Sequence, residues 1–289
     1  MKKSDIRLLS VAAAVILLLC CACALASCRV NNPTDDLSFS ETDDGVTVLG
    51  LGGAAETDII IPRRINGKEV VAVAEGAFKD SGITSLVLPN TVKSVGKSAF
   101  ENCDSLESVI VSGSIDSLPE RCFFDCDSLS GVILQSGVHN IGASAFENCG
   151  ALASINFPAS LVEIGARAFA DCSSLSSIDF EKGVKIIGDD AFSGCVALSN
   201  VDLTKSLETI GDRAFAGCSS IETFFVPKGV RSVGENAFKD CSKLNSIRFE
   251  RGSAWRDASE QARSEEHMSE PESARFFREG NARFESSAP

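Results

Sequence analysis

The sequence is poor in several residue types that carry chemistry. Tyrosine is absent from the 289 residues, tryptophan occurs once and histidine twice. The two histidines, His139 and His267, leave little material for imidazole metal sites or histidine-based catalysis. Basic residues are also in the minority, with 27 Lys and Arg against 40 Asp and Glu and a formal charge of -13. Because phosphate binding requires a basic surface, we expect no nucleic-acid partner.

The N-terminus has the pattern of an export signal. Lys2, Lys3 and Arg7 precede an apolar stretch, Leu8 to Ala26, that is interrupted only by Ser10. The stretch ends in Leu-Ala-Ser-Cys at residues 25–28, which resembles the lipobox of bacterial lipoproteins. The resemblance implies that residues 1–27 are removed and that Cys28 carries the lipid. Alternatively, the stretch remains as an uncleaved membrane helix, and the basic flank predicts export in either case.

Two short segments follow this signal. Residues 28–36, with Pro33 among polar residues, are typical of a tether. Residues 37–56 are expected to form an N-terminal hairpin or cap, because apolar and polar residues alternate on both sides of an Asp44-Gly45 turn.

Cysteine and phenylalanine are abundant, at 12 and 18 copies, and they mark a repeat. Seven cysteines follow one another at intervals of 23 residues, at Cys103, Cys126, Cys149, Cys172, Cys195, Cys218 and Cys241. A phenylalanine stands three residues before each of them, at Phe100, Phe123, Phe146, Phe169, Phe192, Phe215 and Phe238. The unit is too short to enclose its own core, so residues 57–250 are expected to stack as a solenoid.

The repeat also predicts local structure. Its Ile-x-Phe ending places two side chains on one face of a short strand, and stacked coils would align these strands in a parallel sheet. A glycine recurs after Val or Ile at positions 96, 142, 165, 188, 211 and 234. We expect it to serve a turn with positive φ or a close approach of backbones.

The pattern Gly-x-x-Ala-Phe-x-x-Cys-x-x-Leu-x-x-Ile-x-Phe-Pro resembles the BspA-type leucine-rich repeats of bacterial surface proteins. The stretch Ile59-Ile60-Ile61-Pro62 followed by residues 65–70 resembles that family's opening segment. The resemblance implies a leucine-rich repeat solenoid, α/β or mostly β, as a curved stack of coils. It also implies roles in adhesion or partner binding and offers no catalytic residue.

The recurrent cysteine is expected to be a buried, free side chain. A metal site would need several ligands at one point, whereas each coil supplies a single thiol in line with the others. Disulfides between coils stay open as an alternative, because a spacing of about 4.8 Å suits their geometry. An eighth cysteine, Cys122, occupies the alanine slot of its coil, and Ser81 takes the cysteine slot of an earlier one.

The candidate binding surface is the outward position of each strand. Along the stack this position is polarised, with apolar residues first and then polar and acidic ones: Ile60, Val87, Ile110, Ile133, Asn156, Asp179, Asp202, Phe225 and Arg248. Exposed apolar rows often mark interaction sites, but ordinary strand packing or a covering loop would explain the row as well. The pair Asp179 and Asp202 suggests a cation site less well than a solvated face.

The segment from 251 to 289 departs from the repeat, and we consider a cap, a disordered tail or an altered reading frame. No nucleotide or zinc motif occurs, and His139 lies at a variable repeat position, so we expect neither an enzyme nor a cofactor. The expected protein is an exported, lipid-anchored surface solenoid that binds a protein, or a host or bacterial surface ligand. The alternatives are a structural envelope protein without a specific ligand and a glycan-binding module.

Overall fold

The computed structural model describes residues 37–53, 57–250, 255–256 and 284–286. The signal segment, the tether and Cys28 therefore lie outside the described residues, as does most of the tail. The described residues belong to one unit, Asp36–Pro289, and form strands and turns without a helix. It follows that the described part of the chain offers no helix capable of crossing a membrane.

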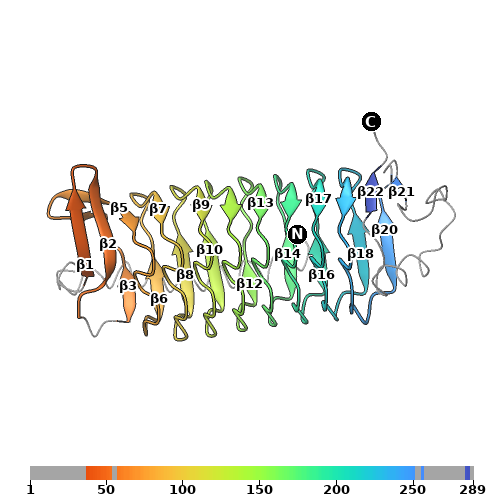
Figure 1. The fold of residues 1–289 in the computed structure, drawn as a ribbon, viewed down its shortest axis with the longest axis horizontal. Helices are drawn as coiled ribbons and strands as arrows, with labels where there is room; N and C mark the ends of the chain where they lie inside the picture. Colours follow the sequence, from red (N-terminus) through yellow and green to blue (C-terminus); the bar gives the residue numbers. More distant parts are fainter. Residues whose placement is uncertain (1–36, 54–56, 251–254, 257–283, 287–289) are drawn as a thin grey trace, which may run out of the picture. The chain divides into compact units, whose positions relative to one another are not determined.

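The Ile-x-Phe endings of the coils form a row of short parallel strands, which we call the first strand row. Neighbouring strands pair in the register that the repeat predicts, with Ile60 opposite Val87, Val87 opposite Ile110 and Ile110 opposite Ile133. Figure 1 shows these strands side by side along the stack. They are β3 (Asp58–Ile60), β6 (Ser85–Val87), β8 (Ser108–Val111), β10 (Gly131–Leu134), β12 (Ser154–Ile155), β14 (Ser177–Asp179), β16 (Asn200–Asp202), β18 (Thr223–Val226) and β20 (Ser246–Phe249).

A second strand row lies where the sequence predicts only turns. Each of its later strands has two residues and ends at the apolar residue of the Ile-Gly motif, or at Leu118 in the coil that has Pro119 instead. Two residues are too few for an alternating pattern, so the repeat did not indicate these strands. The row comprises β5 (Lys68–Val73), β7 (Ser94–Val95), β9 (Ser117–Leu118), β11 (Asn140–Ile141), β13 (Glu163–Ile164), β15 (Ile186–Ile187), β17 (Thr209–Ile210) and β19 (Ser232–Val233).

Antiparallel strands lie at both ends of the second row. At the N-terminal end, β1 (Leu37–Thr42) and β2 (Gly45–Leu51) form a hairpin, and β2 pairs with β5. The short β4 (Arg64–Ile65) also pairs with β5. At the C-terminal end, β22 (Phe284–Ser286) pairs with β19, and β21 (Trp255–Arg256) pairs with β22. The described parts of the tail thus occupy the position that a cap would take.

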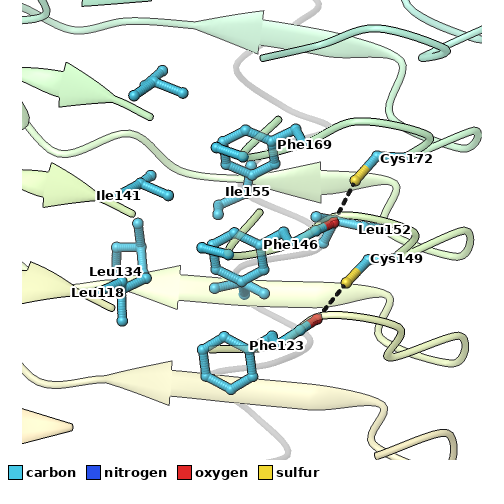
Figure 2. Packing of buried hydrophobic residues seen from close by; sticks show 14 of the residues in the cluster. Leu118, Phe123, Leu134, Ile141, Phe146, Cys149, Leu152, Ile155, Phe169 and Cys172 are labelled. Carbon is cyan, nitrogen blue, oxygen red and sulfur yellow. Dashed lines mark hydrogen bonds between the residues drawn. The ribbon is translucent and has the colours of Figure 1, made fainter. Parts of the chain in front are cut away.

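The core between the two rows is continuous from coil to coil. Its centre is a column of eight phenylalanines, from Phe78 to Phe238, whose neighbouring ring centroids lie 5.2 to 5.7 Å apart and whose planes differ by 2° to 13°. Figure 2 shows Phe123, Phe146 and Phe169 stacked one above another in this column. All eight rings are at most 1% exposed. Because each coil shares its core with its neighbours, no coil has a core of its own.

The repeated glycine serves the close approach of backbones. A Cβ on Gly142 would lie 2.7 Å from the carbonyl oxygen of Leu118 and 2.8 Å from the backbone nitrogen of Glu120. Positive φ angles fall elsewhere, two residues after this glycine, at Ser98, Arg121, Ser144, Arg167, Asp190, Arg213 and Asn236. They also fall just before the Ser81 or cysteine slot, at Asp80, Asn102, Asp125, Asn148, Asp171, Gly194, Gly217 and Asp240. Of the two roles expected for the glycine, the close approach is the one observed.

Candidate functional site

The cysteine side chains point inward and join neighbouring coils. Cys149 donates its thiol proton to the carbonyl oxygen of Phe123 in the preceding coil at 3.1 Å, and Cys172 does the same to Phe146 (Figure 2). All seven repeat cysteines make this bond at 3.1 to 3.2 Å. They are buried and free, as is Cys122. The ladder therefore links coils through hydrogen bonds.

Burial also makes several of these thiols poor nucleophiles. It raises the pKa of Cys195 and of Cys241 to about 12, and it raises the pKa of Cys172 and Cys218 well above the ordinary value. A thiol reacts as its thiolate, which these values keep scarce near neutral pH. The cysteines consequently belong to the architecture of the solenoid.

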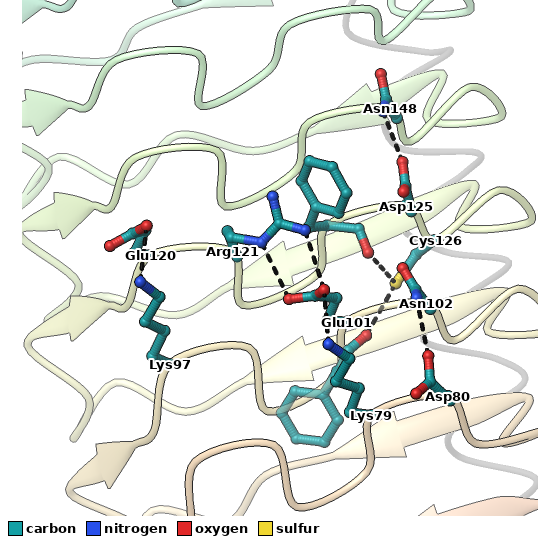
Figure 3. A network of polar contacts seen from close by, with 12 residues as sticks. Lys79, Asp80, Lys97, Glu101, Asn102, Glu120, Arg121, Asp125, Cys126 and Asn148 are labelled. Atoms are coloured by element: carbon teal, nitrogen blue, oxygen red, sulfur yellow. Dashed lines mark hydrogen bonds and ion pairs between the residues drawn. The ribbon is translucent and has the colours of Figure 1, made fainter.

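The turns beside the cysteines carry a ladder of ion pairs. Arg121 binds Glu101 of the preceding coil through two hydrogen bonds of 3.0 Å, and Lys79 approaches the same carboxylate at 3.0 Å (Figure 3). Glu101 is only 5% exposed, and the hydrogen bond from Arg121 lowers its pKa to about 2. The equivalent pair two coils further on joins Arg167 with Glu147, and Arg213 binds Asp190, which occupies a different slot of its coil. These buried carboxylates are matched by cations and are not catalytic candidates.

An acidic hollow lies beside this ladder, and two of its side chains are hydrogen-bonded to each other. Its lining consists of Asp80, Asn102, Asp104, Asp125 and Asp127. Asn102 donates to Asp80 at 2.8 Å (Figure 3). Within the described ranges, no group of three or more His, Cys, Asp or Glu side chains is arranged to hold a metal ion.

The outward positions of the first strand row follow one another along the stack, and they are paired in register from β3 to β10, between β14 and β16, and between β18 and β20. Ile60 is 47% exposed and Phe225 46% exposed, whereas Val87, Ile110 and Ile133 are half-buried. The remaining members are exposed, namely Asn156, Asp179, Asp202 and Arg248. The structure thus places all nine candidate binding residues on the same face of the row. The N-terminal hairpin pairs with the second row and leaves Ile60 exposed.

Asn156 marks the boundary between the apolar and acidic parts of this line. Its side-chain amide accepts a hydrogen bond from the backbone nitrogen of Leu134 at 2.8 Å and donates to the carbonyl oxygen of Leu134 at 2.7 Å. These two side-chain hydrogen bonds take the place of backbone pairing at this position, and β12 has only two residues. The sheet formed by β3, β6, β8, β10 and β12 ends at β12. The next two strands, β14 and β16, form a separate two-stranded sheet. A side chain that imitates backbone pairing is not evident from the repeat.

Small residues accompany the line two positions earlier in each strand. They are mostly serines, and Gly131 in β10 has no atom within 4 Å of where a Cβ would stand. The space above the sheet beside Ile133 is therefore open. The members of this second line are Ser85, Ser108, Gly131, Ser154, Ser177, Asn200, Thr223 and Ser246.

The repeat motif and the coil geometry agree with a known family. The model for the BspA type leucine-rich repeat region matches residues 57–176 and 162–254, with six copies. The chain belongs to this family. A search of curated proteins gave no match.

Two solved structures of leucine-rich repeat proteins are similar to this BspA-type chain. The Treponema pallidum leucine-rich repeat protein is 27% identical, with a TM-score of 0.60, over 74% of this chain and 90% of that protein. A leucine-rich repeat protein from Bacteroides ovatus is 26% identical, with a TM-score of 0.53, over 76% of this chain and 70% of that protein. Both are identified as leucine-rich repeat proteins, which agrees with the repeat-based identification and points to no enzyme family.

His139 occupies an exposed position on this BspA-type scaffold. Its Nδ1 lies 2.8 Å from an Asp116 carboxylate oxygen, and its side chain is 48% exposed. A surface pair of this kind, without a nucleophile or a hollow around it, offers no arrangement for general base catalysis. The only feature of the described residues that combines exposure, apolar character and continuity is the first strand row.

Proposed function

We propose that this chain is an exported, lipid-anchored surface protein that binds another protein, or a host or bacterial surface ligand, through the outward line of the first strand row. The observation that carries the proposal is the in-register row Ile60, Val87, Ile110 and Ile133 on the outward face. An apolar row that is partly exposed and flanked by small polar residues has the composition of an interaction surface. Binding, and not catalysis, is the activity that such a face supports.

The test replaces two central residues of the apolar row. In the Ile110→Lys, Ile133→Lys variant, two ammonium groups would occupy the centre of the contact, and both positions are half-buried on a strand face that faces solvent. We expect capture of a partner from host matrix or bacterial surface fractions to be lost while thermal unfolding remains cooperative. The matched control is Ile186→Lys, which makes the same change at a 38% exposed residue of the second strand row.

The outcomes of this test separate the candidate functions. Loss of capture in the double variant but not in the control supports recognition through the first strand row. Equal capture by all three proteins contradicts the proposal and favours a structural envelope protein without a specific ligand. Retention on polysaccharide resin, abolished by replacing Phe225, would indicate a glycan-binding module instead.

Export and lipid attachment need a separate experiment. Mass spectrometry of the mature N-terminus should find a lipid-modified residue at Cys28, and globomycin should cause the unprocessed chain to accumulate. A Cys28→Ala variant should lack the lipid and leave the membrane fraction. An unmodified chain that begins at Met1 would contradict the lipoprotein proposal.

A further inference from the structure

The two strand rows differ in how their N-terminal ends are finished. In the second row, β5 pairs with β2 and β2 pairs with β1, so the hairpin extends the sheet beyond the first coil. The other end of that row is covered as well, because β22 pairs with β19. In the first row the sheet ends at β3 (Figure 1), and among the strands that the structure describes only β6 pairs with it. The first strand row therefore begins at an open sheet edge.

The hydrogen bonds of β3 show which of its backbone groups lie on this edge. The backbone nitrogen of Ile61 donates to the carbonyl oxygen of Val87 in β6 at 3.1 Å, and the carbonyl oxygen of Thr57 accepts from the same coil at 2.7 Å. Successive residues of a strand direct their backbone groups to opposite sides. The N–H and C=O groups of Asp58 and Ile60 therefore point away from β6, and they form no hydrogen bond with the described part of the chain.

The side chains of β3 leave this edge accessible. Proteins often shield an edge strand with a charged side chain. The carboxylate of Asp58, however, accepts hydrogen bonds from the hydroxyls of Thr84 and Ser85 at 2.8 Å each and is thus directed toward the next coil. Ile60 is 47% exposed, whereas the outward residues of the next three strands are half-buried. An exposed apolar side chain and unpaired backbone groups therefore coincide on β3.

Building on the proposed function, we infer that the partner contributes an extended strand that pairs with the open edge of β3. This strand would bond the backbone groups of Asp58 and Ile60. An apolar side chain beside Ile60 would extend the row that continues in register through Val87 and Ile110. Pairing through the main chain requires an extended segment whose side chains alternate between the two faces. The partner segment is therefore a strand with apolar residues at alternate positions.

Amide exchange in the purified full-length chain tests strand addition directly. In the free chain the Ile60 amide should exchange rapidly and the hydrogen-bonded Ile61 amide slowly. The probe is the synthetic peptide Lys-Thr-Ile-Thr-Ile-Thr-Lys with methylated isoleucine nitrogens, which leaves donors on one edge only and prevents the peptide from building larger sheets. We expect the probe to slow exchange of the Ile60 amide at least about tenfold.

A control peptide tests whether main-chain pairing causes this protection. It has the same sequence with the threonine nitrogens methylated too, so neither edge keeps its internal donors, and it should leave the Ile60 amide unchanged. Equal effects of the two peptides, or no effect of the probe, would overturn the inference. Protection of Ile60 that rises with the concentration of the chain alone would identify a second copy as the occupant and would also overturn it.

Substitutions at Ile60 separate backbone pairing from side-chain contact. Ile60→Pro removes an N–H that makes no hydrogen bond within the described residues, so unfolding should stay cooperative while affinity for the probe falls at least about tenfold. Ile60→Ala keeps the N–H and should weaken binding at most about fivefold. Fluorescence anisotropy of labelled probe measures both affinities. Equal losses in the two variants would assign the contact to the side chain alone and contradict strand addition.

The same variants distinguish this inference from the proposed function. A captured partner that is lost with Ile110→Lys, Ile133→Lys but retained with Ile60→Pro would leave the outward line as the binding surface and refute strand addition. The reverse result would support pairing at β3 and refute the outward line. A partner retained by both variants would refute both proposals.

Discussion

At the scale of single residues, each repeat cysteine contributes a hydrogen bond as well as core volume. The carbonyl oxygen of Phe169 accepts from the backbone nitrogen of Cys172 and also from the thiol of Cys195 in the next coil. Because a carbonyl oxygen has two lone pairs, both bonds can form together. The thiol thus satisfies a buried acceptor site that a purely apolar side chain would leave empty.

Replacing Cys195 with alanine should destabilise the solenoid by about 1–2 kcal/mol, through the lost hydrogen bond and the small cavity. Chemical denaturation monitored by circular dichroism measures this change. Cys122→Ala is the matched control, because this cysteine occupies the slot that holds Ala99 and Ala145 in the adjacent coils. Its thiol makes no hydrogen bond within the described part of the chain, so its replacement should cost much less. Equal costs would contradict a hydrogen-bonding role for the ladder.

The buried carboxylate of Glu101 should make stability depend on acid pH. Its pKa is about 2 in the folded chain and near 4.5 in the unfolded one, so its contribution is complete above pH 4.5. The contribution is lost as the pH falls toward 2 and is on the order of 3 kcal/mol.

Denaturant titrations between pH 6 and pH 2.5 would measure how much Glu101 contributes to the free energy of unfolding. In Glu101→Gln, the part of the acid destabilisation that this carboxylate causes should disappear. The control is Glu163→Gln, an exposed carboxylate on the second strand row, which should keep the acid dependence of the parent. If Glu101→Gln and the parent lose stability in parallel, the ion pair with Arg121 does not have the role assigned to it.

At the scale of the elements, the sequence predicts the first strand row well and the second poorly. The Ile-x-Phe spacing is a period-two signal, so the strands and their register follow from it directly. Apart from β5, the strands of the second row have two residues each, and most of them pair where the repeated glycine brings backbones together. Nothing in a single sequence distinguishes such a pair of residues from a turn.

The positive φ angles were harder to anticipate, because most of them do not fall on glycine. Arg121 adopts φ of 56°, and its guanidinium is held by Glu101 and lies 3.4 Å from the centre of the Phe124 ring. Contacts between coils therefore stabilise a conformation that an arginine rarely adopts alone. The role of Asn156 was also not anticipated: its side-chain amide pairs with the backbone of Leu134, and the sheet formed by β3, β6, β8, β10 and β12 ends there.

The close approach at the repeated glycine gives a prediction of opposite signs at two sites. Gly142→Ala would place a Cβ 2.7 Å from the Leu118 carbonyl oxygen and should destabilise the fold by about 1–3 kcal/mol, because backbone atoms must shift. Gly150→Ala meets only a serine hydroxyl at 3.8 Å and should be neutral or stabilising by about 0.5 kcal/mol. Thermal unfolding of the two variants would measure this difference in stability. Similar losses of stability in both variants would contradict a close backbone approach at Gly142 as the cause.

At the scale of the whole molecule, the solenoid owes its integrity to a core that runs through every coil. Residues 28–250 carry the entire formal charge of -13, because the segments before and after them contribute +2 and -2. Of this charge, residues 28–56 carry -5 and residues 57–250 carry -8, so the solenoid itself is acidic, which disfavours anionic partners there. The core follows from the repeat, whereas the charge and the character of the strand face come from the variable positions.

The continuous core predicts that the eight buried thiols become reactive together. In the native chain, alkylation followed by peptide mapping should leave these eight cysteines unlabelled. With increasing denaturant they should be labelled at one common midpoint, because no coil can retain a core after its neighbours unfold. Separate midpoints for different coils would contradict a single cooperative unit, and cysteines that resist labelling after unfolding without reductant would indicate disulfides.

The central claim is that the first strand row is the binding face, and cross-linking on intact cells tests it most directly. Gly131 can be replaced with a photoreactive amino acid, because the space above it is open. Glu163, exposed on the second strand row, provides the matched position. Illumination should produce a cross-linked partner from position 131 and none from position 163. Equal cross-linking at both positions, or cross-linking at position 163 alone, would contradict the account.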